Sequence, residues 1–330
     1  MTTVAVIGAR GYLGRELVRF LLAHPEVDRI VTASVGGAGG PYKEAVPAFA
    51  GIPTLSVVAA DDNTVREADA VFLATASGEA KTLLPALVAA GPKVIIDLSR
   101  DHRHEGLSKK DGWVYGMPEA GLPVAKGAKK IANPGCYPTA AILSLAPALS
   151  AGLLAPGPVI VDGKSGVSGA GATPRPDLHF AETNESVRAY KVLGHDHEEE
   201  MRLAAARVAK GQGPAVRFTP HLVPMNRGLL TTAYAPIAPG VTVGDLQAAY
   251  KEAYAATVFV SLVQEADTAH VRGSNRAHIA VDVHPETGLV VARGAIDNLA
   301  KGGAGAAVQN LNRALGFNET YGLPLVGGTP

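Results

Sequence analysis

The feature that most constrains the fold is a short apolar strand that leads directly into a glycine-rich turn and an amphipathic helix. The strand is Val4 to Ile7. The apolar residues that follow recur at helical spacing, at Leu13, Leu17, Phe20 and Leu21. Further strands are expected at 30–33, 70–74 and 94–98, and a helix at 80–90. This alternation predicts a parallel sheet covered by helices, the α/β architecture of a Rossmann-type dinucleotide-binding domain.

Residues beyond 136 have a different pattern, with longer strand-like runs. These runs are 159–161, 216–218, 229–237 and 278–283. The last run meets 289–292 across Pro285-Glu-Thr-Gly288, a sequence typical of a hairpin turn. Helical spacing returns at 246–253 and at 307–315. Since 330 residues exceed the usual size of one domain, we expect a second, strand-rich α+β domain.

Composition limits the partners and the compartment. Thirty basic residues balance thirty acidic ones, which argues against nucleic acid or an anionic membrane as the main partner and favours a small solute. The single cysteine cannot form an intrachain disulfide, and the first strand begins too close to Met1 to leave room for a signal peptide. We therefore expect a cytoplasmic protein. The charge-free stretch 131–161 is interrupted by prolines and glycines, so it is expected in the core and not in a membrane.

Three glycines form the pattern G-x-x-G-x-x-G between the first strand and the first helix: Gly8, Gly11 and Gly14. Glycine lets the backbone turn sharply and approach a pyrophosphate, whose charge is stabilised by the N–H groups at a helix N-terminus. Glycines can also serve only the close packing of a helix on a strand. The position between a strand and a helix favours dinucleotide binding.

The residues after the second strand bear on the choice of dinucleotide. An Asp or Glu about 20 residues after the glycine loop is typical of NAD binding, because it bonds the ribose 2′-hydroxyl. Here the strand ends in Ala33-Ser34-Val35, without an acid. The Ser34 hydroxyl could donate to a 2′-phosphate, and Arg10 could add positive charge from the glycine loop. Unless both side chains are only solvated, they favour NADP(H) as the cofactor.

The segment Asn133-Pro-Gly-Cys-Tyr-Pro-Thr139 is the most informative in the chain. Its Pro-Gly pair predicts a tight turn, and Pro138 suits the first turn of a helix that the apolar run 140–145 continues. Cys136 is therefore expected at a helix N-terminus, where the positive end of the helix lowers the pKa of a thiol and stabilises the nucleophilic thiolate. A lone cysteine is more often inert and buried. This turn, directly after a nucleotide domain, favours catalysis.

The segment 131–140 resembles the signature of the N-acetyl-γ-glutamyl-phosphate reductases, which make N-acetylglutamate semialdehyde in arginine biosynthesis. Other blocks resemble those of the same family, in the same order and over almost the whole chain. They are Asp97-Leu-Ser99, Tyr115-Gly-Met-Pro-Glu119, Lys164-Ser-Gly-Val-Ser-Gly-Ala-Gly171, Gly194-His-Asp-His197, Phe218-Thr-Pro-His-Leu-Val-Pro-Met-Asn-Arg-Gly228 and Ile296-Asp-Asn-Leu-Ala-Lys-Gly302.

The resemblance implies a semialdehyde dehydrogenase type of fold. An NADP-binding Rossmann domain would comprise 1–137 and 299–330, and an α+β catalytic and oligomerisation domain would comprise 138–298. The final helix would pack on the Rossmann domain, and the protein would form a homodimer or homotetramer. No metal is implied. Residues that would join those named above in binding the cofactor are Tyr12, Leu13, Ser165, Gly166 and Asn298.

The resemblance also assigns His197 as the general acid and base. Three glutamates, 198–200, follow it at the start of an expected helix. Neighbouring carboxylates would favour the charged imidazolium that activates a thiolate or protonates an oxyanion. His195, two residues away, is the competing candidate and a candidate substrate ligand.

The segment Lys164–Gly171 carries small residues, hydroxyls and a cation, a composition able to hold a phosphoryl group through backbone N–H groups. Glycine and serine alone would also suit a flexible surface loop. Ser165 is therefore a candidate substrate ligand as well. Arg103 and Arg227 are further candidates for binding the anionic substrate, although exposed arginines usually contact only water.

Three positions depart from the family pattern. The arginine that often follows the second-strand serine is missing, which bears on NADP binding. Thr75-Ala-Ser-Gly78 stands in place of a Pro-His-Gly segment, and Asp196 stands in place of an arginine. These differences indicate a locally different edge of the cofactor or substrate site.

The expected reaction is the reduction by NADPH of a small-molecule acyl phosphate through a thioester on Cys136. One alternative is a carrier-linked aminoadipyl- or glutamyl-phosphate reductase of the same fold, against which Tyr137-Pro138 argues by resemblance. Another is an aspartate-semialdehyde dehydrogenase, which has a different turn around its cysteine. A non-catalytic dinucleotide sensor is an alternative of another class, and it would not need a reactive thiol.

Overall fold

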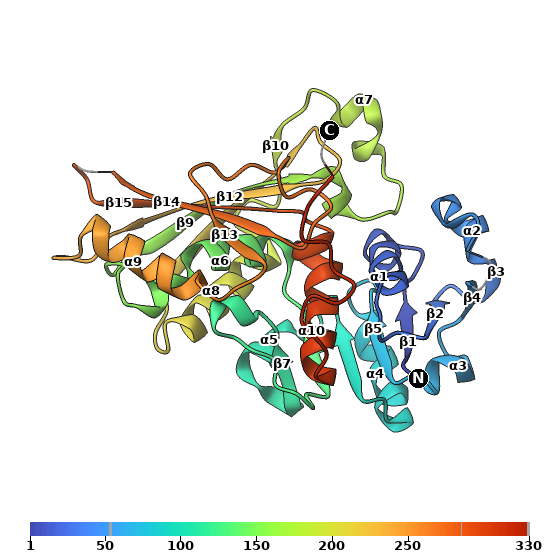
Figure 1. Cartoon of the computed structure of the whole chain (residues 1–330). Helices are drawn as coiled ribbons and strands as arrows, with labels where there is room; N and C mark the ends of the chain where they lie inside the picture. Colours follow the sequence, from blue (N-terminus) through green and yellow to red (C-terminus); the bar gives the residue numbers. More distant parts are fainter. Residues whose placement is uncertain (53–54, 285, 329–330) are drawn as a thin grey trace. The chain divides into compact units, whose positions relative to one another are not determined.

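The computed structural model describes residues 1–52, 55–284 and 286–328, which form two compact units (Figure 1). Unit 1 comprises Met1–Gly116, Val124–Pro134 and Gly303–Leu323. Unit 2 comprises Met117–Pro123, Gly135–Gly302 and the described residues from Pro324 on. The chain thus passes from one unit to the other next to Cys136. The functional division of the chain into a cofactor domain and a catalytic domain stays a prediction.

Unit 1 is built on an eight-stranded sheet with the strand order β3-β4-β2-β1-β5-β6-β8-β7. Its neighbouring strands are parallel except for β3 and β4. The parallel sheet expected from the alternating pattern is therefore confirmed. The strands are β1 (Thr3–Ile7), β2 (Arg29–Ser34), β3 (Gly39–Pro41), β4 (Ser56–Ala59), β5 (Ala70–Leu73), β6 (Val94–Asp97), β7 (Trp113–Tyr115) and β8 (Lys130–Ala132).

Helices cover both faces of this sheet. On one face, Ala5 and Ile7 of β1 belong to a buried cluster with residues of α3 (Asn63–Arg66) and α4 (Glu79–Ala90). The alternate residues Val4 and Val6 point the other way and are also fully buried. There α1 (Tyr12–Leu22) packs on α10 (Gly305–Leu315), so the final helix returns to unit 1 as expected. The smaller helices of the unit are α2 (Tyr42–Ala45) and α5 (Arg103–Ser108).

Unit 2 is built on a seven-stranded mixed sheet with the strand order β10-β11-β9-β12-β15-β14-β13. The hairpin expected around 285–288 is confirmed by the antiparallel pairing of β14 with β15, although Pro285 itself lies outside the described residues. The strands are β9 (Pro158–Gly166), β10 (Arg188–Ala189), β11 (Ala215–Val223), β12 (Leu229–Pro236), β13 (Val260–Leu262), β14 (Ala277–His284) and β15 (Leu289–Ile296).

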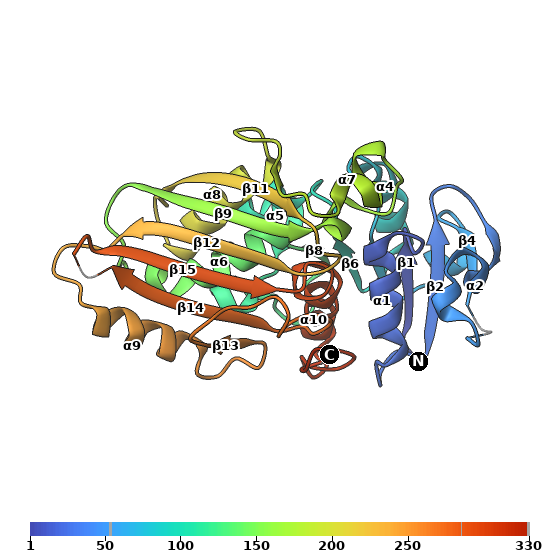
Figure 2. The ribbon, with the colours of Figure 1, turned by 90° about the horizontal axis from the view of Figure 1, so that it is seen from above.

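One face of the unit 2 sheet is covered by α6 (Cys136–Ser150), α8 (Asp196–Val208) and α9 (Val243–Tyr254), as Figures 1 and 2 show. The short helix α7 (Phe180–Thr183) lies in the excursion between β9 and α8. Figure 2 looks onto the opposite face, and no helix of the described residues lies over the strands there. Strand alternation fits this arrangement, because Val159 and Val161 are buried whereas Ile160 between them is 44% exposed. The unit is therefore a two-layer α+β structure, as predicted.

The charge-free stretch of the sequence forms α6, which is buried along most of its length. Pro147 lies inside this helix and has no N–H to donate to the carbonyl of Leu143, four residues earlier. The hydroxyl of Tyr254, on α9, donates to that carbonyl instead, and the hydroxyl of Tyr250 donates to the carbonyl of Ser144. The two tyrosines thus tie α9 to the central helix.

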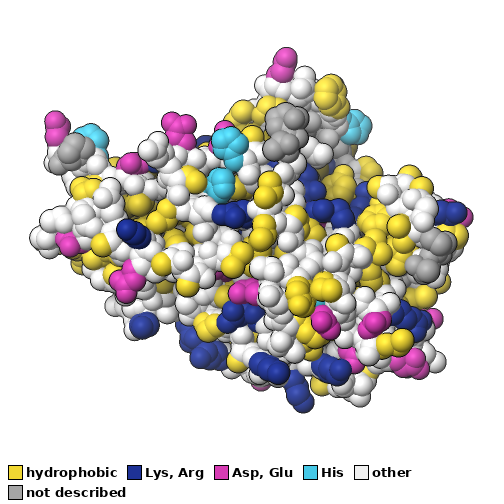
Figure 3. All heavy atoms as spheres, in the orientation of Figure 1, with side chains coloured by type: hydrophobic (Ala, Val, Ile, Leu, Met, Phe, Trp, Pro, Cys, Tyr) yellow, Lys and Arg dark blue, Asp and Glu magenta, His cyan; other side chains and the backbone are white. Residues whose placement is uncertain are grey.

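Among the described residues no helix is long and apolar enough to cross a membrane. Charged side chains of both signs are scattered over the face of the molecule in Figure 3. This distribution fits the equal numbers of acidic and basic residues in the sequence.

Candidate active site

Cys136 is the first residue of α6, and Gly135 is its N-cap. The cap has extended backbone angles, φ −71° and ψ 158°, and no side chain caps the helix. Its carbonyl accepts hydrogen bonds from the backbone N–H and the hydroxyl of Thr139, which hold the first turn. The expected place of Cys136 at a helix N-terminus is confirmed. The thiol is unbonded to any other cysteine, and the residue is partly exposed.

A buried carboxylate joins this turn to the histidine segment. Glu200 is 2% exposed, and its Oε1 accepts a hydrogen bond of 2.8 Å from the N–H of Gly135. Its Oε2 lies 4.0 Å from Nε2 of His197. Both residues belong to the first two turns of α8, whose N-cap is His195. Glu200 therefore places negative charge beside the imidazole and fixes the residue that precedes Cys136.

The two preceding glutamates, Glu198 and Glu199, bind other partners. Glu198 accepts a hydrogen bond from the N–H of Phe218, and Glu199 forms a bidentate ion pair with Arg202. The sequence pattern could not distinguish the three carboxylates. At helical spacing only the third of them turns inward toward His197.

Aromatic packing also connects the cysteine turn to the histidines. The ring of Tyr137 makes edge contacts with His195 and His197, each with ring centroids 6.0 Å apart. The same ring contacts Phe218 at 4.9 Å, and its hydroxyl donates to the carbonyl of His221. The residue next to Cys136 is thereby locked in one orientation. Tyr137, the neighbour of Cys136, therefore packs against both His195 and His197.

Tyr190 is a further residue of the candidate site, and no pattern in the sequence indicated it. Its ring packs against His195 at 5.6 Å, and its hydroxyl shares a hydrogen bond with Tyr137. Burial raises the pKa of Tyr190 to about 12, so the phenol stays protonated at neutral pH. No motif marks it, because it follows the two-residue strand β10 at a place that only tertiary contacts define.

The expected loop at 164–171 is wrong in its first part. Lys164, Ser165 and Gly166 continue β9, which pairs with β11 on one side and β12 on the other. A central position in the sheet overrides the weak strand preference of serine and glycine. Ser165 is 1% exposed, so the flexible surface loop is excluded there. A single 3₁₀ turn, Val167–Ala170, follows the strand.

Asn298 lies beside this strand end in unit 2. Its side-chain oxygen accepts from the N–H of Gly228, and its amide donates to the hydroxyl of Ser168. A Cβ at Gly169 would lie 2.9 Å from the Ser165 hydroxyl. Ser165, Gly166 and Asn298 thus belong to one cluster of small and polar groups.

The two candidate arginines differ in their surroundings. Arg227 pairs with both carboxylate oxygens of Asp297, at 2.9 and 3.0 Å, within unit 2. Arg103 lies in unit 1 and is buried, with 8% of its surface exposed, whereas the sequence led us to expect an exposed side chain. Its guanidinium donates to the carbonyls of Leu98 and Asn133. Arg103 therefore supports the backbone three residues before Cys136.

The glycine loop of unit 1 has the geometry of a strand-to-helix turn. Gly8 has φ +88°, and a Cβ there would lie 2.3 Å from the carbonyl oxygen of Ala74. A Cβ at Gly14 would lie 2.2 Å from the carbonyl oxygen of Gly8. Close packing explains these two glycines. Gly11 is different, because it is the N-cap of α1, has no side chain to cap the helix, and a Cβ there would make only an ordinary contact, 3.4 Å from the carbonyl oxygen of Gly8.

The other cofactor candidates lie around this helix start. Tyr12 and Leu13 are the first two residues of α1, and Ser34 is the last residue of β2. The guanidinium of Arg10 reaches the backbone of Gly39, where a Cβ would lie 2.5 Å from one of its nitrogens. The loop thus offers a helix N-terminus without a side-chain cap, together with a guanidinium, which suits a phosphate-bearing ligand.

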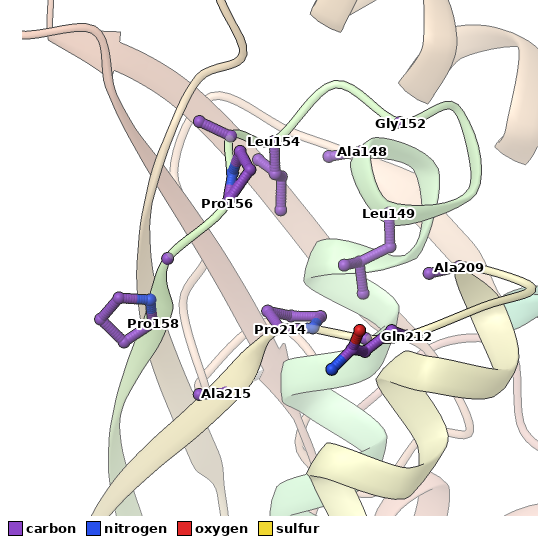
Figure 4. Close-up of a pocket in the computed structure, with 13 residues that line it drawn as sticks. Ala148, Leu149, Gly152, Leu154, Pro156, Pro158, Ala209, Gln212, Pro214 and Ala215 are labelled. Carbon is purple, nitrogen blue, oxygen red and sulfur yellow. The ribbon is translucent and has the colours of Figure 1, made fainter.

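A cavity of about 650 Å³ lies elsewhere in unit 2 (Figure 4). It is formed by the C-terminal end of α6, the segment that leads to β9 and the segment between α8 and β11. Its lining is mostly apolar and includes Leu149, Leu154, Pro156, Pro214 and the amide of Gln212. None of the candidate site residues lines it, so it is separate from the cysteine site.

Two family models match the chain. One is described as "Semialdehyde dehydrogenase, NAD binding domain" and matches residues 3–126. The other is described as "Semialdehyde dehydrogenase, dimerisation domain" and matches residues 136–298. The second match begins at Cys136.

Curated relatives match over the full length. The N-acetyl-gamma-glutamyl-phosphate reductase of Brevibacillus brevis is 41% identical over 345 residues, which cover 99% of each chain. That of Moorella thermoacetica is 39% identical over 348 residues, which cover 100% of each chain.

Solved structures of lower identity share the fold. Aspartate semialdehyde dehydrogenase II from Vibrio cholerae, complexed with ASA, is 17% identical with a TM-score of 0.74 and covers 95% of this chain and 98% of its own. The Candida albicans aspartate semialdehyde dehydrogenase with NADP is 16% identical with a TM-score of 0.71 and covers 96% and 99%.

Proposed function

Because the chain belongs to the N-acetyl-gamma-glutamyl-phosphate reductase family, we propose that it reduces N-acetyl-γ-glutamyl phosphate to N-acetylglutamate 5-semialdehyde and phosphate in arginine biosynthesis. The observation that carries this proposal is the place of the single cysteine. Cys136 opens α6, with His197 and its partner Glu200 held against the same turn. A sensor that only binds a dinucleotide has no need of this arrangement.

In the proposed mechanism His197 takes the proton of the Cys136 thiol. The thiolate attacks the acyl carbon, the bond from that carbon to the phosphate oxygen breaks, and a thioester remains on Cys136. The nicotinamide, when bound, supplies the hydride that reduces the thioester. Cys136 then leaves the resulting thiohemiacetal as a thiolate, which releases the semialdehyde and regains a proton from His197. The N–H groups at the start of α6 would stabilise negative charge on the carbonyl oxygen.

The family model supports a nicotinamide dinucleotide, and we propose NADP(H). Gly11, Tyr12 and Leu13 would hold the pyrophosphate at the start of α1, and Arg10 and Ser34 would hold the 2′-phosphate. Ser165, Gly166 and Asn298 are the proposed contacts in unit 2.

The choice of cofactor can be tested at Ser34. In Ser34→Asp, a carboxylate would repel a 2′-phosphate and could accept from a ribose 2′-hydroxyl, so the ratio of kcat/KM for NADPH to that for NADH should fall. Ser34→Ala is the matched control and should lower the ratio less. A wild-type enzyme whose kcat/KM for NADH equals or exceeds its kcat/KM for NADPH would contradict the proposal.

The dimerisation-domain match supports an oligomer, and we propose that a second copy of the chain covers the open face of the unit 2 sheet. Ile160 and Tyr234 are paired across β9 and β12 on that face and are 44% and 36% exposed. Changing both to arginine should produce monomers in sedimentation experiments. An unchanged oligomer would exclude this face as the interface. We propose the cytoplasm as the compartment, since a single cysteine cannot form an intrachain disulfide.

The substrate is tested by running the reaction in the direction of aldehyde oxidation, with inorganic phosphate present. N-acetylglutamate semialdehyde, aspartate semialdehyde and a carrier-linked glutamate semialdehyde are compared with each dinucleotide. The proposal requires the acetylated aldehyde to have the highest kcat/KM. A higher kcat/KM for another aldehyde would mean that the enzyme catalyses the same type of reaction on a different substrate.

A further inference from the structure

An ion pair between two buried side chains lies in unit 2, outside the residues that the mechanism uses. Nζ of Lys301 and Oε1 of Glu119 are 2.6 Å apart, and the two side chains are 2% and 5% exposed. The ammonium also lies 5.1 Å from the ring centroid of Phe259. Burying two charges costs solvation energy that a pair of apolar side chains would not cost, so stability alone is a weak reason for such a pair.

Lys301 belongs to an unusual piece of backbone. Residues Ala300–Ala304 form a single π-helical turn, a geometry that is rare and is frequent at functional sites. Asp297 anchors the start of the turn, because its Oδ1 accepts from the N–H groups of Leu299 and Ala300. Its carbonyl accepts from the N–H of Gly302. Asp297 therefore fixes the backbone at the beginning of the turn, and Glu119 fixes the side chain of Lys301 within it.

This turn lies directly behind the nucleophile. A Cβ built on Gly302 would be 2.8 Å from Cβ of Cys136 and 3.2 Å from its Cα. Contacts this short are not tolerated, so only glycine lets the π-helical turn approach Cys136 so closely. The short helix Pro118–Ala120, which carries Glu119, also contacts α6. The ion pair thus joins two elements that both pack on the helix of the cysteine.

We propose that Lys301 and Glu119 are positioning residues for Cys136. Their ion pair fixes the π-helical turn so that Gly302 supports the cysteine, and this support sets the direction and reactivity of the thiol. The inference rests on the proposed function for its effect on turnover. Its effect on the thiol does not, because the reaction of the only cysteine with iodoacetamide needs neither substrate nor cofactor.

The decisive variant replaces both charges, as Lys301→Met with Glu119→Leu. Single replacements leave an unpaired buried charge and destabilise the protein for that reason, whereas an apolar pair can preserve stability. The double variant should therefore keep the wild-type Tm. Its rate of Cys136 alkylation and its kcat should fall about tenfold or more, since a small misplacement of a reacting group can cost about 10²-fold. The KM for the dinucleotide should not change.

Gly302→Ala provides a second test that does not depend on the charges. The added methyl group must displace Cys136 or the turn, so alkylation should slow as it does in the double variant. Gly244→Ala is the matched control, because its Cβ would lie 3.6 Å from the nearest atom, the Thr242 hydroxyl, in α9. This control should alkylate at the wild-type rate.

The outcomes separate this inference from the proposed function. A double variant that keeps its Tm, its alkylation rate and its kcat would show a merely structural pair and overturn the inference. If the double variant has a lower Tm than the wild type, its alkylation rate cannot be interpreted, and the alkylation rate of Gly302→Ala decides the question. If Cys136 is alkylated in Gly302→Ala at the wild-type rate, the inference is overturned. Failure of the wild-type enzyme to reduce the proposed substrate would overturn the proposed function and leave the alkylation test intact.

Discussion

The carboxylate of Glu200 accepts a hydrogen bond from the backbone N–H of Gly135, 65 residues earlier in the chain. The same carboxylate lies 4.0 Å from His197 through its second oxygen. One buried side chain therefore orients the residue before Cys136, the proposed nucleophile, and adds negative charge beside His197, the proposed acid and base. Glu200 acts through these two groups, so it is a positioning residue.

Glu200→Gln should separate the two roles. Glutamine can still accept the hydrogen bond from Gly135 but carries no charge. The imidazolium of His197 should then form only at lower pH, and the pH profile of kcat should shift to lower pH with a loss of about tenfold, as for about 1.4 kcal/mol of lost charge interaction. Glu200→Ala should lose more. A Gln variant with the wild-type pH profile would show that the charge has no influence on His197.

A second prediction concerns the stability of the central helix. Tyr254→Phe removes the hydroxyl that donates to the carbonyl of Leu143, which Pro147 leaves without a helical donor. The buried carbonyl is then unsatisfied, at a cost of about 1–3 kcal/mol in the free energy of unfolding. Tyr250→Phe is the control, because the carbonyl of Ser144 still accepts a hydrogen bond within the helix after the Tyr250 hydroxyl is removed. Equal losses in urea unfolding would contradict the role given to Pro147.

The pH dependence of stability should reflect His24. Burial lowers the pKa of His24, opposed in part by its hydrogen bond to Asn312 and by Glu26. The folded protein thus favours the neutral ring, whereas the unfolded chain takes up a proton at about pH 6.5. Stability from this group is present above that pH and is lost as the pH falls below it toward the folded-state pKa.

The measurement is Tm at pH 7.5 and pH 5.5 for the wild type and for His24→Gln. The variant should lose less stability between the two pH values, even if it is less stable throughout. His278, whose pKa burial also lowers, titrates in the same direction in both proteins and cancels in the comparison. Parallel losses in the two proteins would contradict the assignment to His24.

Local signals in the sequence predicted much of the site. The tight turn expected at Pro134-Gly135 is wrong, because Gly135 has extended backbone angles and leads straight into the helix. The helix that begins at Cys136 was predicted correctly, because Pro138 suits the first turn of a helix, which is a local property. The strand, loop and helix of the dinucleotide fold were predicted for the same reason. Apolar alternation and helical spacing are also local properties, and most expected elements appear in the structure with shifts of one or two residues at the ends. Strands β9, β11 and β15 run four or five residues beyond their expected C-terminal ends, and α9 begins three residues earlier than expected.

Contacts between distant segments could not be predicted. Glu119 and Lys301 meet across 182 residues, and nothing near either residue marks the other. Arg103 was expected to be exposed, yet it is buried against two carbonyls that only the folded sheet brings together. Lys164 to Gly166 were assigned to a loop by their composition, while pairing with two neighbouring strands makes them a strand.

The central claim is that Cys136 carries the acyl group, and mass spectrometry tests it most directly. The wild-type protein is incubated with N-acetyl-γ-glutamyl phosphate in the absence of reduced cofactor, digested and compared with Cys136→Ser treated in the same way. Because the thiol is the proposed nucleophile, we expect the mass of an N-acetylglutamyl group on the Cys136 peptide of the wild type alone, and its loss on addition of NADPH. The serine variant should bind dinucleotide and lose nearly all turnover. Acyl label on another residue, or substantial activity in Cys136→Ser, would contradict the thioester mechanism.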